Sequence, residues 1–208
     1  GEGSLGARGR IVLTSGGSTS STGGSISLSS GYSRATTSGS FSIKTSESGS
    51  AGTSGSLQIS TGVAQSGSSG SIVVLSGQAT SGTGGSISVN VGHGNAGPGG
   101  RITVSAGGSS DSTGGSVSIS TGFGVGTSSG SFTLMTPQAG LAGTSGHISI
   151  KSGAAYSGSS GSLALSSGAS ASSGTGGSIS LVVGAGNYGV GGRLVMSAGG
   201  TSDLTGGS

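Results

Sequence analysis

The sequence contains no cysteine and no tryptophan, only two prolines, and few charged or aromatic residues among its 208 positions. Without cysteine there is neither a disulfide framework nor thiol chemistry, and this absence leaves the cellular compartment open. Charged residues make up 5% of the chain and aromatic residues 3%, so the side chains that catalyse reactions or bind metals are scarce. The composition names no reaction, and we expect no enzyme activity, no cofactor and no metal site.

The remaining charge is sparse and of mixed sign. Seven basic and four acidic residues give a formal net charge of +3, too little for the phosphate contacts of a nucleic-acid-binding surface. No apolar run approaches the roughly 20 residues that a membrane helix needs, so we expect no membrane span. The chain opens on Gly1 with neither Met nor a leader sequence, which favours an excerpt of a longer chain.

Glycine, serine and threonine fill 126 of the 208 positions, a composition that ordinarily indicates a disordered linker. The hydrophobic residues argue against disorder because they recur in pairs every 15 or 16 residues. The thirteen pairs, each separated by one residue, are Ile11/Leu13, Ile26/Leu28, Phe41/Ile43, Leu57/Ile59, Ile72/Val74, Ile87/Val89, Ile102/Val104, Val117/Ile119, Phe132/Leu134, Ile148/Ile150, Leu163/Leu165, Ile179/Leu181 and Leu194/Met196. A disordered linker has no reason to keep such a register.

Each apolar pair predicts a short β-strand. The residue inside the pair is usually small and polar, as Ser27 is between Ile26 and Leu28, and this alternation is typical of a half-buried strand. The glycine-rich segments between the pairs favour turns. Four residues after the first apolar position the side chain is again small, as at Ser15 and Ser30, which we interpret as a tightly packed corner.

A strand with two inward apolar side chains is not stable alone, but strands stacked in register place like residues about 4.8 Å apart. We therefore predict an all-β fold, a β-solenoid of stacked β-helix coils built from units of about 15 residues. One, two or three units per coil fit the sequence. The main alternative is an antiparallel sandwich, which is less favoured because its loops should vary in length by more than one residue.

A longer period of 91 to 92 residues, or six units, runs through the same array. Arg10, Arg101 and Arg193 each precede an apolar pair, and Asp111 recurs as Asp203. We predict a single continuous repeat array over residues 1–208, with blocks at approximately 9–99, 100–191 and, in part, 192–208. Stacked repeats need caps or continuation at their ends, so we expect the array to continue in a longer chain.

Two glycine-rich loops, Gly92–Gly97 and Gly184–Gly189, match the pattern G-x-G-x-x-G. Dinucleotide binding needs this pattern between a strand and a helix N-terminus, with an acidic residue about 20 positions later in a βαβ unit, whereas no part of this sequence is expected to be helical. The calcium-binding repeat of parallel β-rolls has Asp where these loops have Asn95 and Asn187. We interpret both loops as turns.

The titratable residues form no catalytic or metal-binding pattern. The acidic residues are Glu2, Glu47, Asp111 and Asp203. A glycosidase needs two carboxyls within about 5 to 10 Å, and we interpret Asp111 and Asp203 as turn-capping groups instead. His93 and His147 have no acidic or cysteine partner at metal-ligand spacing, and we expect both to be solvent-facing loop residues.

The outward side chains are mostly hydroxyls. No N-x-S/T sequon occurs, but O-linked glycans on loops dense in Ser and Thr would explain how a chain with so few charges stays soluble. The three block arginines are interpreted as charges that limit lateral aggregation of edge strands. An ice-binding lattice of threonines is not favoured because the outward strand positions are mainly serine.

The units Thr22–Leu28, Gly82–Val89 and Gly174–Leu181, which read T-G-G-S-I-S-L or close to it, resemble the Gly/Ser/Thr-rich tandem repeats of large extracellular structural proteins of microalgae and related protists. The resemblance implies a fibre or cell-surface protein that is extracellular and glycosylated, with no catalytic residues. We therefore expect a non-enzymatic structural protein that self-associates end to end or laterally into stiff fibres. The alternative is a β-solenoid whose hydroxyl-rich face binds ice, polysaccharide or silica.

Overall fold

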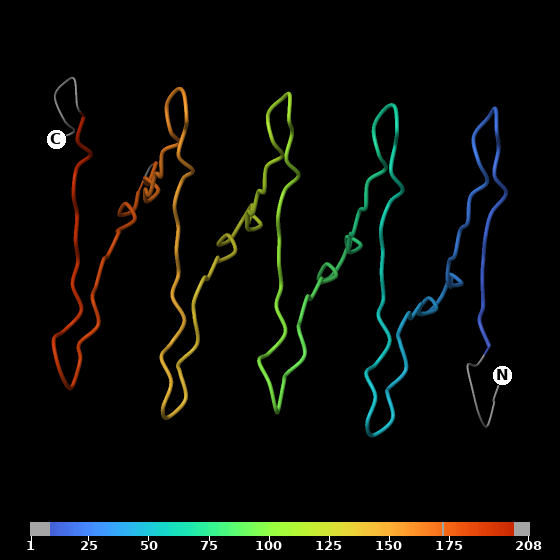
Figure 1. The fold of residues 1–208 in the computed structure, drawn as a ribbon, viewed down its shortest axis with the longest axis horizontal. Helices are drawn as coiled ribbons and strands as arrows, with labels where there is room; N and C mark the ends of the chain where they lie inside the picture. Colours follow the sequence, from blue (N-terminus) through green and yellow to red (C-terminus); the bar gives the residue numbers. More distant parts are fainter. Residues whose placement is uncertain (1–8, 172, 202–208) are drawn as a thin grey trace. The chain divides into compact units, whose positions relative to one another are not determined.

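The computed structural model describes residues 9–171 and 173–201, and within these ranges the chain forms neither helix nor β-strand. Straight extended segments, which carry the apolar pairs, alternate with closed loops (Figure 1). The chain divides into two units, Gly1–Thr103 and Val104–Ser208. The same alternation of segment and loop runs through the described residues of each unit.

The predicted all-β solenoid is therefore wrong, and no sheet of the alternative sandwich is present in the described residues either. These residues form eight backbone–backbone hydrogen bonds, whereas folded globular proteins have about one internal hydrogen bond per residue. Six of the eight join the two ends of a loop, and the other two close turns inside loops. A β-strand requires a ladder of such bonds to a neighbour, and no bond reaches the apolar pairs, so the segments are extended without being strands.

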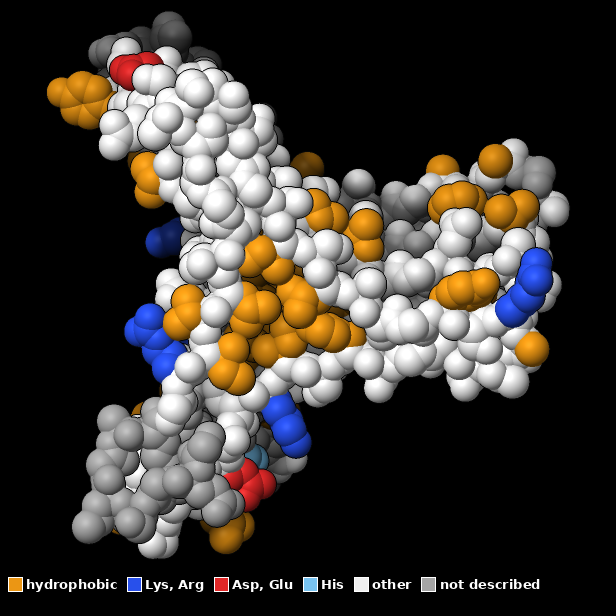
Figure 2. Space-filling view, turned by 90° about the vertical axis from the view of Figure 1, so that its right-hand side faces the viewer, with side chains coloured by type: hydrophobic (Ala, Val, Ile, Leu, Met, Phe, Trp, Pro, Cys, Tyr) orange, Lys and Arg blue, Asp and Glu red, His pale blue; other side chains and the backbone are white. Residues whose placement is uncertain are grey.

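The predicted half-burial of the apolar pairs is also wrong. In residues 9–171 and 173–201 no side chain is buried, and every residue except the half-buried Thr136 and Ala139 is exposed. Ile26 and Leu28 keep 50% and 64% of their surface in solvent, and Figure 2 shows hydrophobic side chains lying open on the viewed face. The described residues thus form no hydrophobic core.

Each loop is closed by the predicted corner residue, which lies against a glycine two residues before the next apolar pair. We call this contact the loop neck. In the first described loop, a Cβ on Gly24 would lie 3.1 Å from the Ser15 Cβ. The Ser15 hydroxyl donates a hydrogen bond of 2.9 Å to the Gly24 carbonyl oxygen, and the Gly24 N–H donates one of 2.8 Å to the Gly16 carbonyl oxygen.

The loop neck recurs in every described loop. The twelve pairs are Ser15/Gly24, Ser30/Gly39, Thr45/Gly55, Thr61/Gly70, Ser76/Gly85, Val91/Gly100, Ala106/Gly115, Thr121/Gly130, Thr136/Gly146, Ser152/Gly161, Ser167/Gly177 and Val183/Gly192. The corner side chain occupies the space that a glycine Cβ would fill, so the chain can fold back within about nine residues. This contact is local in sequence and needs no neighbouring segment.

The long period of the sequence reappears in the loops. In the third loop of each block the residue after the corner is not glycine but Ser46 or Pro137, and these two loops contain an inner turn that the others lack. Its hydrogen bonds run from the Gly52 N–H to the Gly49 carbonyl at 3.2 Å and from the Gly143 N–H to the Gly140 carbonyl at 3.3 Å. The same sequence variation therefore produces the same local geometry 91 residues apart.

Candidate functional site

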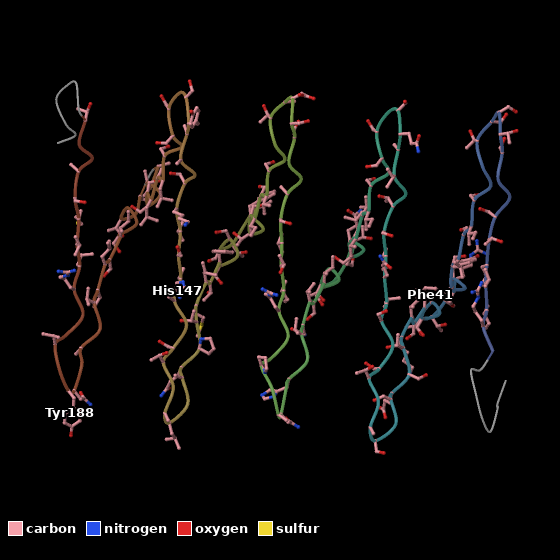
Figure 3. All side chains as sticks on the ribbon, in the orientation of Figure 1. Phe41, His147 and Tyr188 are labelled. Atoms are coloured by element: carbon pink, nitrogen blue, oxygen red, sulfur yellow. The ribbon has the colours of Figure 1, made fainter. Side chains whose placement is uncertain are left out.

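The extended segment is the feature that every unit presents to solvent. Its two apolar side chains lie on the same face, because residues i and i+2 of an extended chain point to the same side. The first of the two is usually the less exposed, as with Ile87 at 53% and Val89 at 70%. Phe41 occupies the first position on one such segment (Figure 3). With no hydrogen bond on the backbone of these pairs, each segment offers both an apolar stripe and free N–H and C=O groups, the two elements by which an extended chain recruits another.

Hydroxyl groups divide into two sets. In the loops, serines fold the chain locally: the Ser18 oxygen accepts a hydrogen bond of 2.9 Å from the Ser21 N–H, and the Ser33 oxygen accepts one of 3.1 Å from the Thr36 N–H. These contacts are local bonds from the backbone to a serine side chain, which favour turns over regular secondary structure. In the extended segments the hydroxyls of Ser25 and Ser27 make no such bond and are exposed, whereas the Ser88 oxygen accepts a hydrogen bond of 2.9 Å from Asn90 Nδ2.

Among the described residues, the hydrogen bonding of Asp111 is confined to a neighbouring serine. Ser110 Oγ donates a hydrogen bond of 3.3 Å to Asp111 Oδ2, but the bend at this loop is capped by Ser109, whose oxygen accepts from the Ser112 N–H at 3.0 Å. Serine therefore takes the capping role that the sequence predicts for Asp111. Glu2 and Asp203 lie outside the described residues.

The two histidines occupy different parts of the unit. His93 lies in the loop 92–100, as predicted, whereas His147 directly precedes Ile148 on an extended segment and is not a loop residue (Figure 3). Both are exposed. Within residues 9–171 and 173–201 no group of three or more His, Cys, Asp or Glu side chains is placed to hold a metal ion.

The loop 92–100 surrounds an open hollow. Its cavity of about 340 Å³ is lined by Val91, Gly92, His93, Gly94, Gly99 and Gly100. Two carbonyl oxygens turn toward Gly94, because a Cβ there would lie 3.0 Å from the oxygen of Gly97 and 3.1 Å from that of Pro98. No helix follows this loop, so the dinucleotide-binding arrangement is absent and the loop is a glycine-rich turn.

Arg101 and Arg193 are exposed at the beginnings of extended segments, as is Arg10. The interpretation of these arginines as edge-strand charges is wrong in this structure, because the described residues contain no strand whose edge they could protect.

The glycine of the loop neck is the position that the strand-based interpretation overlooks. A glycine stands two residues before the first apolar residue of all thirteen units, from Gly9 to Gly192. This regularity is as strict as that of the apolar pairs and is the signal that predicts the neck contact.

No protein family, curated protein or solved structure matches the chain. The described residues also contain no helix long and apolar enough to cross a membrane.

Proposed function

We propose that the chain is a non-enzymatic structural protein of the extracellular space or cell surface, which self-associates laterally into fibres and carries O-linked glycans. The observation that carries this proposal is the row of apolar pairs, regularly spaced and open to solvent, on segments whose backbone is unpaired. Such segments have their binding partners outside the single chain.

The extent of exposed surface supports association over a solitary chain. The accessible surface is 20406 Å², against about 8,300 Å² for a folded monomer of 18.8 kDa. The accessible surface beyond that of a folded monomer is several times the 1,200 to about 2,000 Å² that a stable protein–protein interface buries. The apolar part of this surface, which includes the exposed pairs, is favourably removed from water, so its burial against a neighbouring chain would stabilise the assembly.

A second copy of the same chain is the partner that fits best. Its extended segments carry the same pair spacing, so antiparallel pairing of segments from two chains satisfies free backbone groups and brings apolar residues of both chains together. Only a few charges oppose such contact, since the net charge is +3. Association here joins separate chains laterally and involves no stacking of coils within one chain.

The hydroxyl groups support the glycoprotein part of the proposal. Loop serines such as Ser18 and Ser33 are engaged in local hydrogen bonds, whereas segment serines such as Ser25 are free, and all are exposed. The resemblance to extracellular repeat proteins of microalgae supports the location. Surface binding to ice, polysaccharide or silica is less favoured, because a flat hydroxyl lattice needs paired strands to hold it.

Cryo-electron microscopy and sedimentation velocity of the purified chain, over a range of concentrations, test the proposal. We expect filaments that appear above a threshold concentration, with a spacing near 4.8 Å from interchain strand pairing, and mass spectrometry of native material should find hexose-bearing Ser or Thr. A chain that stays monomeric at all concentrations, with or without its glycans, would refute the fibre function.

A further inference from the structure

We propose that the peptide bonds Arg101–Ile102 and Arg193–Leu194 are processing sites, cut by an endopeptidase that holds the arginine side chain in an acidic pocket. The two cuts divide the array at its block boundaries and release residues 102–193 as one block. The proposal is independent of fibre formation, because a single chain carries everything that the peptidase recognises.

The residues on both sides of each bond are open to a partner. Arg101 and Arg193 are exposed, and Ile102 and Leu194 each keep 54% of their surface in solvent. No backbone hydrogen bond reaches the extended segments that begin at these residues. An extended chain with free backbone groups can pair with the edge of a partner's sheet, while pockets take alternate side chains. The segment after each arginine therefore already has the form that a peptidase cleft binds.

The loop necks directly before the two arginines differ from the other ten. Val91/Gly100 and Val183/Gly192 are the only necks that have neither a corner hydroxyl nor a hydrogen bond from the glycine N–H. Contact of a valine with a glycine is all that closes them, whereas the neck at Ala106 keeps a backbone hydrogen bond of 2.9 Å. The chain before each arginine can therefore straighten into a cleft without breaking a hydrogen bond.

Arg34, Lys44 and Lys151 do not combine these features. Arg34 lies in a bend that is held by a hydrogen bond of 3.1 Å from the Thr36 N–H to the Ser33 oxygen. Each of the two lysines directly precedes the corner residue of a loop neck, and no apolar residue follows it. A guanidinium also binds a carboxylate through two parallel hydrogen bonds, which a lysine ammonium cannot form. A pocket that selects arginine therefore leaves the lysines uncut.

The reaction at each site is a hydrolysis. The bond between the Arg101 carbonyl carbon and the Ile102 nitrogen breaks, the hydroxyl of a water molecule joins the carbon, and the remaining hydrogen of that water joins the nitrogen. At neutral pH the new ends are a carboxylate on Arg101 and an ammonium on Ile102. The first of the two units ends at Thr103, two residues after the cut, so the loops of each unit stay whole.

Limited digestion of the full chain with trypsin tests whether these bonds are selected. The chain is kept at a concentration where it is monomeric, and the fragments are followed over time by mass spectrometry of intact products. We expect the cuts after Arg101 and Arg193 to precede the cut after Arg34. Arg101→Gln should remove the first of these cuts and leave the one after Arg193 unchanged.

Ser25→Arg is the matched control for the loop neck. It places an arginine between Gly24 and Ile26, so that a glycine precedes it and an isoleucine follows, as at Arg101. Its neck is closed by hydrogen bonds of 2.9 Å from the Ser15 hydroxyl to the Gly24 carbonyl and 2.8 Å from the Gly24 N–H. Because opening this neck breaks hydrogen bonds, we expect the cut after position 25 to be about five times slower than the cut after Arg101.

Processing itself is read from native material, in which mass spectrometry should find chains that begin at Ile102 or Leu194. Native chains without such ends would overturn the proposal. Equal cutting rates after Arg34 and Arg101, or after Arg101 and position 25 in Ser25→Arg, would equally exclude selection by the loop neck. All digestions use monomeric chains, so none of these outcomes bears on filament formation and the two proposals fail separately.

Discussion

The Ser167 hydroxyl donates a hydrogen bond of 2.9 Å to the carbonyl oxygen of Gly177, ten residues further along the chain. In the same loop neck the Gly177 N–H donates to the Gly168 carbonyl at 3.0 Å, and a Cβ on Gly177 would lie 3.0 Å from the Ser167 Cβ. Three short contacts therefore meet at one point of the loop. The neck is the most heavily bonded part of a unit whose extended segments have no backbone partner.

Ser167→Ala should loosen this neck without changing the extended segments. One exposed hydrogen bond contributes about 1 kcal/mol or less, so we expect faster amide exchange at Gly177, by a factor of a few, in nuclear magnetic resonance. Ser152→Ala is the matched control, because Ser152 packs on Gly161 at 3.3 Å but donates no hydrogen bond. Equal effects at the two necks would mean that the hydroxyl contributes nothing to closure.

Gly100→Ala should open its loop more severely than any serine substitution. The added methyl group would overlap Val91 Cγ1, and the same holds for Gly192 and Val183. We expect large chemical-shift changes throughout residues 92–100, and Gly99→Ala should cause few, because a Cβ there meets nothing within 4 Å. If overlap is the cause, Val91→Ala combined with Gly100→Ala should restore the parental spectrum. An unchanged spectrum in Gly100→Ala alone would show that the contact is not kept in solution.

Gly67→Ala should distort the bend at residues 65–67. Gly67 has φ of +114° and its block equivalent Gly158 has φ of +113°, a region that residues with a Cβ rarely adopt. We expect the strained backbone to raise the free energy of this bend by about 1 kcal/mol or more. The change should appear as altered chemical shifts confined to that loop. Gly62→Ala, with nothing within 4 Å and no positive φ, is the comparison. If Gly67→Ala and Gly62→Ala had equally small effects, the bend would not require a glycine at position 67.

Replacing both Ile87 and Val89 with Ser should weaken association. Ile87 and Val89 are 53% and 70% exposed, and burying that surface against a second chain would stabilise the contact by about 1 kcal/mol for each side chain. Every chain in a filament carries the same segment, so every contact would be weakened. We expect the concentration threshold for filaments to rise about tenfold or more, measured by sedimentation. Val125→Ser removes an apolar side chain that is 95% exposed in a loop and should leave the threshold unchanged. If the concentration threshold for filaments rose in Val125→Ser and not in the Ile87 and Val89 variant, the contact between chains would lie in the loops.

Local features of the fold could be predicted from the sequence, and non-local ones could not. Small residues at Ser15 and its equivalents indicated a packed corner, and that corner is a real contact with the following glycine. The period-two pattern at Ile26 and Leu28 indicated a buried strand, yet these residues are exposed and unpaired. Alternation reports which side chains share a face, but it carries no information on whether another segment lies beside that face.

The candidate site shows the same division. The sequence placed His93 in a glycine-rich loop, and its spacing from acidic residues excluded a conventional metal cluster there. It did not indicate that the Gly97 and Pro98 carbonyls converge on Gly94, because carbonyl directions depend on the backbone angles of several successive residues. For His147 the loop assignment was wrong, because the neck glycine Gly146 ends the loop one residue earlier.

By itself the sequence determined the repeated unit: its length, its apolar pair, the small corner and the glycine against which the corner closes. All of these depend on residues within about ten positions of one another, where chain connectivity keeps the partners close and closure costs little entropy. Only the tertiary structure decided that the extended segments of residues 9–171 and 173–201 form no hydrogen-bonded ladder and no core. Pairing requires segments distant in sequence to meet, and the apolar pairs of the described residues lie open to solvent.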